Sequence, residues 1–66
     1  MLAKPNVALT PEGNIQLEWH TLNADLIVEI VDGVYDYYFR DDRGEAEWRT
    51  KDINTIWEYV QSVGEQ

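Results

Sequence analysis

The residues most able to do chemistry surround the single histidine of the chain, His20, which follows Glu18 by two residues and precedes Asp25 by five. An imidazole beside carboxylates can transfer protons or hold a metal ion. However, the chain has no second histidine and no cysteine, and one imidazole with surface carboxylates makes a poor transition-metal site. We therefore predict no metal centre and interpret these residues as an exposed pair across two neighbouring strands.

A second set of carboxylates, Glu18, Glu29 and Asp36, matches the acid pair of a glycosidase in residue type alone. That chemistry requires a cleft in which one carboxyl group keeps a raised pKa. We expect an open sheet instead, because 66 residues leave no room for cleft-forming insertions.

The segment Asp41-Asp42-Arg43-Gly44-Glu45 lacks the roughly 12-residue spacing of an EF-hand calcium loop. The chain is therefore predicted to have no catalytic residues, no cofactor and no enzymatic activity.

The charge of the chain favours a basic partner. Thirteen acidic residues against five lysines and arginines give a formal net charge of −8. This charge repels phosphate backbones and anionic membranes and attracts basic surfaces. We expect a basic protein surface as the partner, such as that of a nucleic-acid-binding protein, and no direct binding to nucleic acid or membrane. The alternative is that the acidic residues serve solubility alone.

Length and composition predict one small folded domain spanning residues 1–66. The 44% hydrophobic content is too high for a disordered chain, and the absence of cysteine excludes a disulfide framework. The first residues lack the apolar run of a signal peptide, and no apolar run is long enough to cross a membrane. We therefore expect a cytoplasmic protein.

Turn-forming residues recur about every eight to twelve positions, which is typical of consecutive antiparallel strands. The clearest turn is Asp32-Gly33, because a type I′ turn needs a positive φ at both central residues. Four-residue loops are predicted at 21–24 and 41–44, and another turn at 11–14. We predict an α+β fold, a four- or five-stranded antiparallel β-meander with one C-terminal α-helix packed on one face. The predicted strands cover about residues 6–10, 14–20, 25–31, 34–40 and 45–50, and the helix about 52–63.

Alternation along these strands places the large apolar residues on one face of the sheet. The predicted core residues of the sheet are Ile15, Leu17, Trp19, Leu26, Val28, Ile30, Tyr35, Tyr37, Phe39, Ala46 and Trp48. An apolar stripe at helical spacing, Ile53, Ile56, Trp57, Val60 and Val63, is predicted to cover this face. Asp52 or Thr50 is expected to cap the first turn of the helix. A core of this size predicts marginal stability or dimerisation.

The stretch Leu9-Thr10-Pro11-Glu12-Gly13-Asn14-Ile15-Gln16-Leu17-Glu18-Trp19-His20, followed by Leu26-Ile27-Val28-Glu29-Ile30, resembles a pattern found in small uncharacterised bacterial and phage-borne proteins. The shared features are a Pro-acidic-Gly turn, a Leu-Glu-Trp strand and a second strand with a central Glu. The resemblance covers about the first half of the chain. No activity is established for that group, so the resemblance implies no function for these residues.

The opposite face of the predicted sheet is acidic around an apolar and aromatic centre. Its register pairs Ile27 with Tyr38 and Glu29 with Asp36, and it sets Arg40 against Glu45 and Asp36 against Arg49. The candidate partner-binding residues on this face are Glu18, Ile27, Glu29, Asp36, Tyr38, Glu45 and Glu47. Charge would steer the encounter with a basic partner while the centre contributes affinity.

The leading hypothesis is therefore a non-enzymatic acidic protein-binding module of the kind seen in phage inhibitors of host defence, DNA mimics and antitoxins. The alternative is a self-associating structural protein. Its symmetric dimer would form through Ile27, Tyr38, Val31 and Val34, or through an exposed edge strand.

Overall fold

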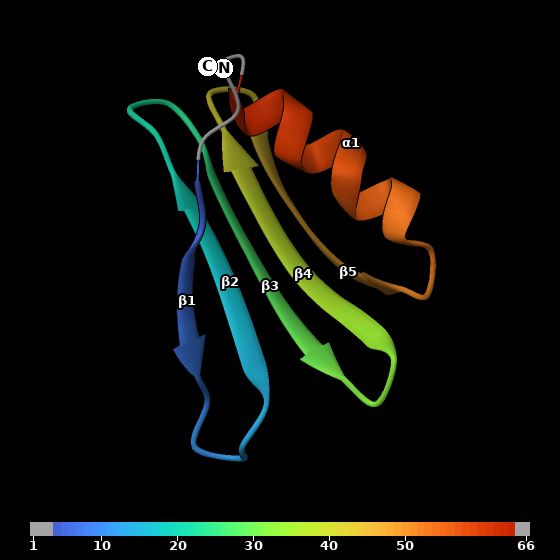
Figure 1. Ribbon diagram of the computed structural model, residues 1–66. Coiled ribbons are helices and arrows are strands. Elements are labelled where there is room, and N and C mark those ends of the chain that lie inside the picture. Colours follow the sequence, from blue (N-terminus) through green and yellow to red (C-terminus); the bar gives the residue numbers. More distant parts are fainter. Residues whose placement is uncertain (1–3, 65–66) are drawn as a thin grey trace.

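The computed structural model describes residues 4–64 and contains five β-strands followed by one α-helix. The elements are β1 (Asn6–Leu9), β2 (Ile15–His20), β3 (Asp25–Val31), β4 (Val34–Asp41), β5 (Gly44–Thr50) and α1 (Ile53–Gly64). The strands form one antiparallel sheet in the order β1-β2-β3-β4-β5, so each strand lies beside its neighbours in sequence (Figure 1). The predicted α+β meander with one C-terminal helix is confirmed.

The turn between β3 and β4 determines the register of the sheet. Asp32 has a φ of 50° and Gly33 a φ of 77°, the positive values that a type I′ turn requires. The turn sets Val31 against Val34 and continues in register along both strands, as predicted. Between β4 and β5 the predicted four-residue loop is wrong, because pairing extends to Asp41 and Gly44 and leaves a two-residue turn. Trimming one residue from each side of the loop leaves the predicted register unchanged.

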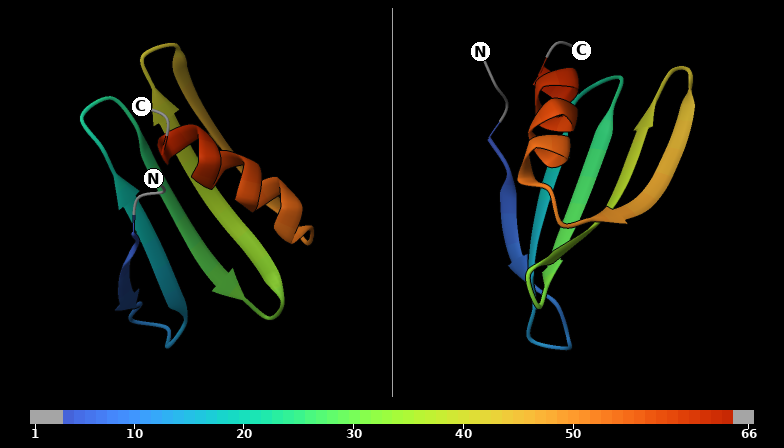
Figure 2. Two further views of the ribbon diagram at one scale, coloured as in Figure 1. Left: turned by 45° about the horizontal axis from the view of Figure 1, so that its top comes forward. Right: turned by 90° about the vertical axis from the view of Figure 1, so that its right-hand side faces the viewer.

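Helix α1 begins at a cap made by the chain that leads out of β5. Asp52 is the N-cap residue, since its Oδ1 accepts the backbone N–H of Asn54 at 2.9 Å. The hydroxyl of Thr50 accepts the N–H of Asp52 at 3.0 Å and fixes the preceding turn. The helix then crosses one face of the sheet diagonally, above the three central strands β2, β3 and β4 (Figures 1 and 2).

The core lies between the helix and these central strands. Its buried apolar residues are Trp19, Ala24, Leu26, Val28, Tyr37, Phe39, Ile56, Val60 and Val63. Tyr59 packs at the edge of this cluster, with its ring centroid 4.9 Å from that of Tyr37 and 5.0 Å from that of Phe39. Ala24 was not predicted, although it precedes Leu26 by two residues and so continues the inward alternation. Burial and a hydrogen bond with Tyr59 raise the pKa of Tyr37.

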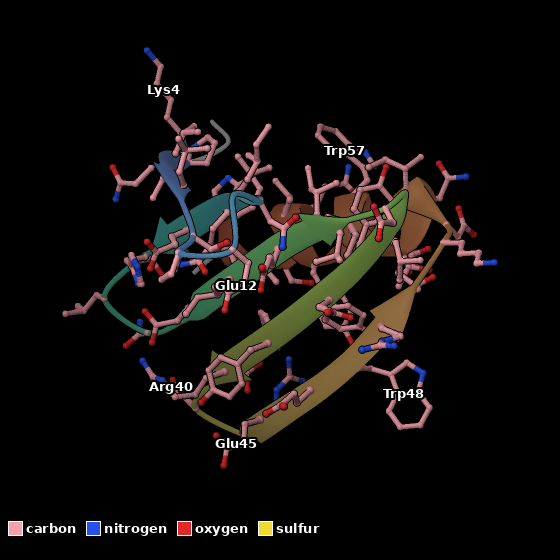
Figure 3. The ribbon with its side chains drawn as sticks, turned by 90° about the horizontal axis from the view of Figure 1, so that it is seen from below. Lys4, Glu12, Arg40, Glu45, Trp48 and Trp57 are labelled. Atoms are coloured by element: carbon pink, nitrogen blue, oxygen red, sulfur yellow. The ribbon has the colours of Figure 1, made fainter. Side chains whose placement is uncertain are left out.

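Four residues predicted for the core are exposed instead: Ile15 by 46%, Trp48 by 73%, Ile53 by 56% and Trp57 by 49%. A helix of 12 residues is about 18 Å long and covers only the middle of a five-stranded sheet. The outer strand β5 curves away from the helix, and Trp48 projects from it into solvent (Figures 2 and 3). On the helix, Trp57 and Tyr59 lie on opposite sides of the buried residue Ile56, and only the Tyr59 side packs against β4.

Alanine substitutions on the helix should therefore separate these two aromatic residues. Tyr59→Ala removes ring contacts with the core and should lower the free energy of unfolding by about 2 kcal/mol or more. Trp57→Ala, the matched control two residues away on the other side of Ile56, should cost less than about 1 kcal/mol because its side chain is half exposed. Urea denaturation followed by circular dichroism measures both values. Equal losses would contradict the observed packing of the helix.

Candidate partner-binding face

The candidate site is the outer face of the sheet, defined here as the face opposite α1. All seven predicted partner-binding residues lie on it, because they occupy the outward positions of β2 to β5. Glu18, Ile27, Tyr38 and Glu47 form one row across these four strands. Gln16, Glu29, Asp36 and Arg49 form the next row, and Glu45 lies beside Arg40 near one end of the sheet.

All residues of these two rows except Glu18 line an open groove of about 680 Å³. The groove residues are Gln16, Ile27, Glu29, Asp36, Tyr37, Tyr38, Glu47, Trp48 and Arg49. Five of the seven predicted residues contribute to it, whereas Glu18 and Glu45 lie outside. Gln16 and Arg49 were not predicted as partner-binding residues, although the predicted register places them in the same row as Glu29 and Asp36. Trp48 and Tyr37 belong to the helix side by alternation, so no sequence pattern links them to the groove.

The charged groups at one end of the outer face form a connected cluster. Asp25 lies at its centre, with Oδ1 2.7 Å from Nδ1 of His20 and Oδ2 accepting a hydrogen bond from Nε of Arg40 at 2.8 Å. A second guanidinium nitrogen of Arg40 donates to the same carboxylate. Arg40 and Glu45 are in register, as predicted, but Glu45 instead accepts a hydrogen bond from the hydroxyl of Tyr38 at 2.5 Å.

The second predicted charge pair is confirmed in the next row. Nε of Arg49 donates to Oδ1 of Asp36 at 2.8 Å, which joins β5 to β4. Glu29 accepts a hydrogen bond from Nδ2 of Asn14 at 3.1 Å, which joins β3 to the turn between β1 and β2. These contacts hold the carboxylates of Asp36 and Glu29 in place on the outer face.

Proton affinities on this face follow from the same contacts. The pKa of His20 is raised, chiefly by its hydrogen bond with Asp25 and further by Glu18, whose Oε1 lies 3.4 Å from Nε2. The pKa of Asp25 is lowered, first by His20 and then by Arg40. The hydrogen bond to Glu45 raises the pKa of Tyr38 and keeps its phenol protonated. Each of these pKa shifts is a consequence of an ion pair or a hydrogen bond on the outer face.

The outer face is thus a charged surface with an aromatic and aliphatic centre, Ile27 and Tyr38. Within residues 4–64, no group of three or more histidine and carboxylate side chains is placed to hold a metal ion. The helix in this part of the chain is too short and too polar to cross a membrane. What this arrangement can do chemically is to offer several fixed carboxylates to a complementary surface.

No family model, curated protein or solved structure matches the chain. The resemblance of the first half to bacterial and phage-borne proteins stays a prediction. Function is therefore inferred from the residues of this chain alone.

The pKa of His20 can be tested directly. We expect a pKa above the ordinary value of 6.5, and a fall toward that value in Asp25→Asn, because Asp25 stabilises the imidazolium. The charged groups around the ring are Glu18 on its own strand, Asp25 on β3 and Arg40 beyond it on β4. NMR titration of the imidazole Cε1–H measures the pKa, and Glu18→Gln is the matched control with a smaller expected fall.

This shift also predicts how stability depends on pH. Because the folded pKa of His20 is raised, its stabilising contribution is complete below about pH 6.5 and disappears as the pH rises through the folded value. Asp25 behaves in the opposite way, because its lowered pKa gives a contribution that disappears only as the pH falls through the folded value. Unfolding curves from pH 5 to 9 that are identical for the wild type and Asp25→Asn, apart from a constant offset, would contradict the raised pKa.

Proposed function

We propose that the protein is a non-enzymatic binding module whose acidic outer face docks on a basic surface of another protein. The observation that carries the proposal is the placement of fixed carboxylates around the groove and its centre, Ile27 and Tyr38. Interfaces that bind specifically commonly combine an apolar and aromatic centre with a polar rim. In such an interface the charges steer the encounter and the centre supplies much of the affinity.

The charge balance of the outer face supports a basic partner. Six carboxylates lie on it against two guanidinium groups: Glu18, Asp25, Glu29, Asp36, Glu45 and Glu47 against Arg40 and Arg49. The arginines pair with Asp25 and Asp36, which leaves the four glutamates without a guanidinium partner in the described residues. The remaining negative charge lies on both sides of Ile27 and Tyr38, where a partner would meet it together with the apolar centre.

The gathering of these carboxylates on four neighbouring strands favours a nucleic-acid-binding protein as the partner. Carboxylates two residues apart on a strand are about 7 Å apart, and neighbouring strands are about 5 Å apart. Proteins that bind nucleic acid carry lysine and arginine groups placed to neutralise regularly spaced phosphates. An array of fixed carboxylates competes for the same groups, which is how a phage inhibitor, a DNA mimic or an antitoxin would act.

The experiment uses the tagged protein as bait to capture partners from a native host lysate, and mass spectrometry identifies them. The affinity for the identified partner is then measured by a binding titration. Glu29→Lys/Glu47→Lys should weaken binding by about tenfold or more, because attraction becomes repulsion at two positions in the groove. These residues are chosen because neither takes part in an ion pair within the described residues, so the fold should persist.

The matched control is Glu12→Lys/Glu58→Lys, which changes the net charge equally at two exposed positions away from the outer face. Binding should persist in this control and should weaken at high salt for every variant that binds. Full binding by Glu29→Lys/Glu47→Lys, with circular dichroism unchanged, would rule out the outer face as the docking surface.

A further inference from the structure

The two edges of the sheet are protected to very different degrees. Strand β5 carries a charged residue at every second position, Glu45, Glu47 and Arg49, which is a usual defence against pairing with another chain. Strand β1 carries none, and all four of its residues are exposed. Val7 and Leu9 point to the helix side, since they lie opposite Leu17 and Ile15, and they are 68% and 76% exposed.

The backbone of β1 offers a defined set of free hydrogen-bonding groups. The N–H of Thr10 donates to the carbonyl of Asn14 at 2.8 Å, which makes these two residues a hydrogen-bonded pair. Because such pairs alternate along antiparallel strands, Ala8 also bonds to β2. The N–H and C=O groups of Val7 and Leu9 must then point away from β2, toward the free edge.

We propose that two copies of this chain associate by antiparallel pairing of β1 with β1, about a twofold axis at Ala8. In this register Val7 faces Leu9 of the second copy, and the four outward groups of each copy all find partners. A shift in either direction brings an outward residue opposite Pro5 or Pro11, which lacks an N–H. The two prolines therefore select a single register.

Charge supports the same register. Lys4 is the only lysine or arginine before Arg40, and it lies just beyond one end of β1, while Glu12 lies just beyond the other end (Figure 3). Both side chains are exposed. Antiparallel pairing about Ala8 brings Lys4 of each copy to the level of Glu12 of the other. The association is thus complementary at its two ends although the chain as a whole is acidic.

The apolar side chains on the helix side complete the interface. Pairing brings Val7 and Leu9 of both copies together next to the exposed Ile15. A strand of four residues makes a small interface, so we expect a weak dimer with a Kd of roughly 10 μM to 1 mM. The product is a continuous ten-stranded sheet with both outer faces open, so this inference does not depend on the proposed function.

Sedimentation equilibrium from about 10 μM to about 1 mM protein should show a mass that rises from monomer toward dimer with concentration. Over the same range, hydrogen exchange at the amides of Val7 and Leu9 should slow by about two- to sevenfold, depending on the Kd, while the amide of Ala8, already bonded to β2, should change little. Leu9→Pro removes one outward N–H without touching the pairing with β2, and it should abolish both the rise in mass and the slowing of exchange at the amide of Val7. A monomer mass throughout, or exchange at Val7 and Leu9 that does not depend on concentration, would overturn the proposal.

A charge exchange distinguishes the register from general repulsion. Glu12→Lys lowers the magnitude of the net charge but sets two lysines together, so it should weaken the dimer by about threefold or more. Asp42→Lys, the matched control in the exposed turn between β4 and β5, changes the net charge equally and should not weaken it. Lys4→Glu/Glu12→Lys should restore the wild-type Kd. Both substitutions reduce the net negative charge equally. If they change the dimer Kd to the same extent, only general repulsion acts between the copies and the proposed register is wrong.

Discussion

The structure depends above all on the two-residue turn at Asp32 and Gly33. Side chains alternate between the faces of a strand, so a slip of one residue in the central hairpin would exchange the core face with the outer face. The positive φ values of both turn residues exclude that slip, because they close the hairpin with Val31 opposite Val34. The core under α1 and the acidic outer face are therefore consequences of one local backbone conformation.

This constraint explains why much of the fold could be predicted from the sequence. Turn chemistry and alternation are local properties, and together they define the register of β2 to β5 and the face that each side chain occupies. They do not define how far the helix reaches. Trp48 and Ile15 face the helix side as expected, yet both are exposed. Trp48 lies on the edge strand β5, and Ile15 is the first residue of β2, at the end of the sheet away from α1 (Figure 1). The choice of Tyr59 over Trp57 likewise depends on which side of the helix lies above β4, and no pattern within the helix determines that.

The candidate site shows the same division between local and three-dimensional information. The register predicted which charged residues share a row, and the pair of Asp36 with Arg49 followed from it. In a sheet, however, each residue of a central strand has a neighbour on both sides. Arg40 lies between Asp25 and Glu45, and the sequence could not determine that it would donate to Asp25. The preference is understandable because Asp25 also pairs with His20, while Glu45 is already bonded to Tyr38.

The faces and edges of the sheet suit different kinds of association. If two outer faces packed together around Ile27 and Tyr38, the glutamates on either side of this centre would meet glutamates of the second copy, and their burial would be costly. The same glutamates favour a basic partner of another kind. Strand β1 is the reverse case: it carries no charge, and its flanking charges, Lys4 and Glu12, have opposite signs. The proposed partner surface and the proposed self-pairing edge would therefore not compete, because they differ in charge and lie on separate parts of the sheet.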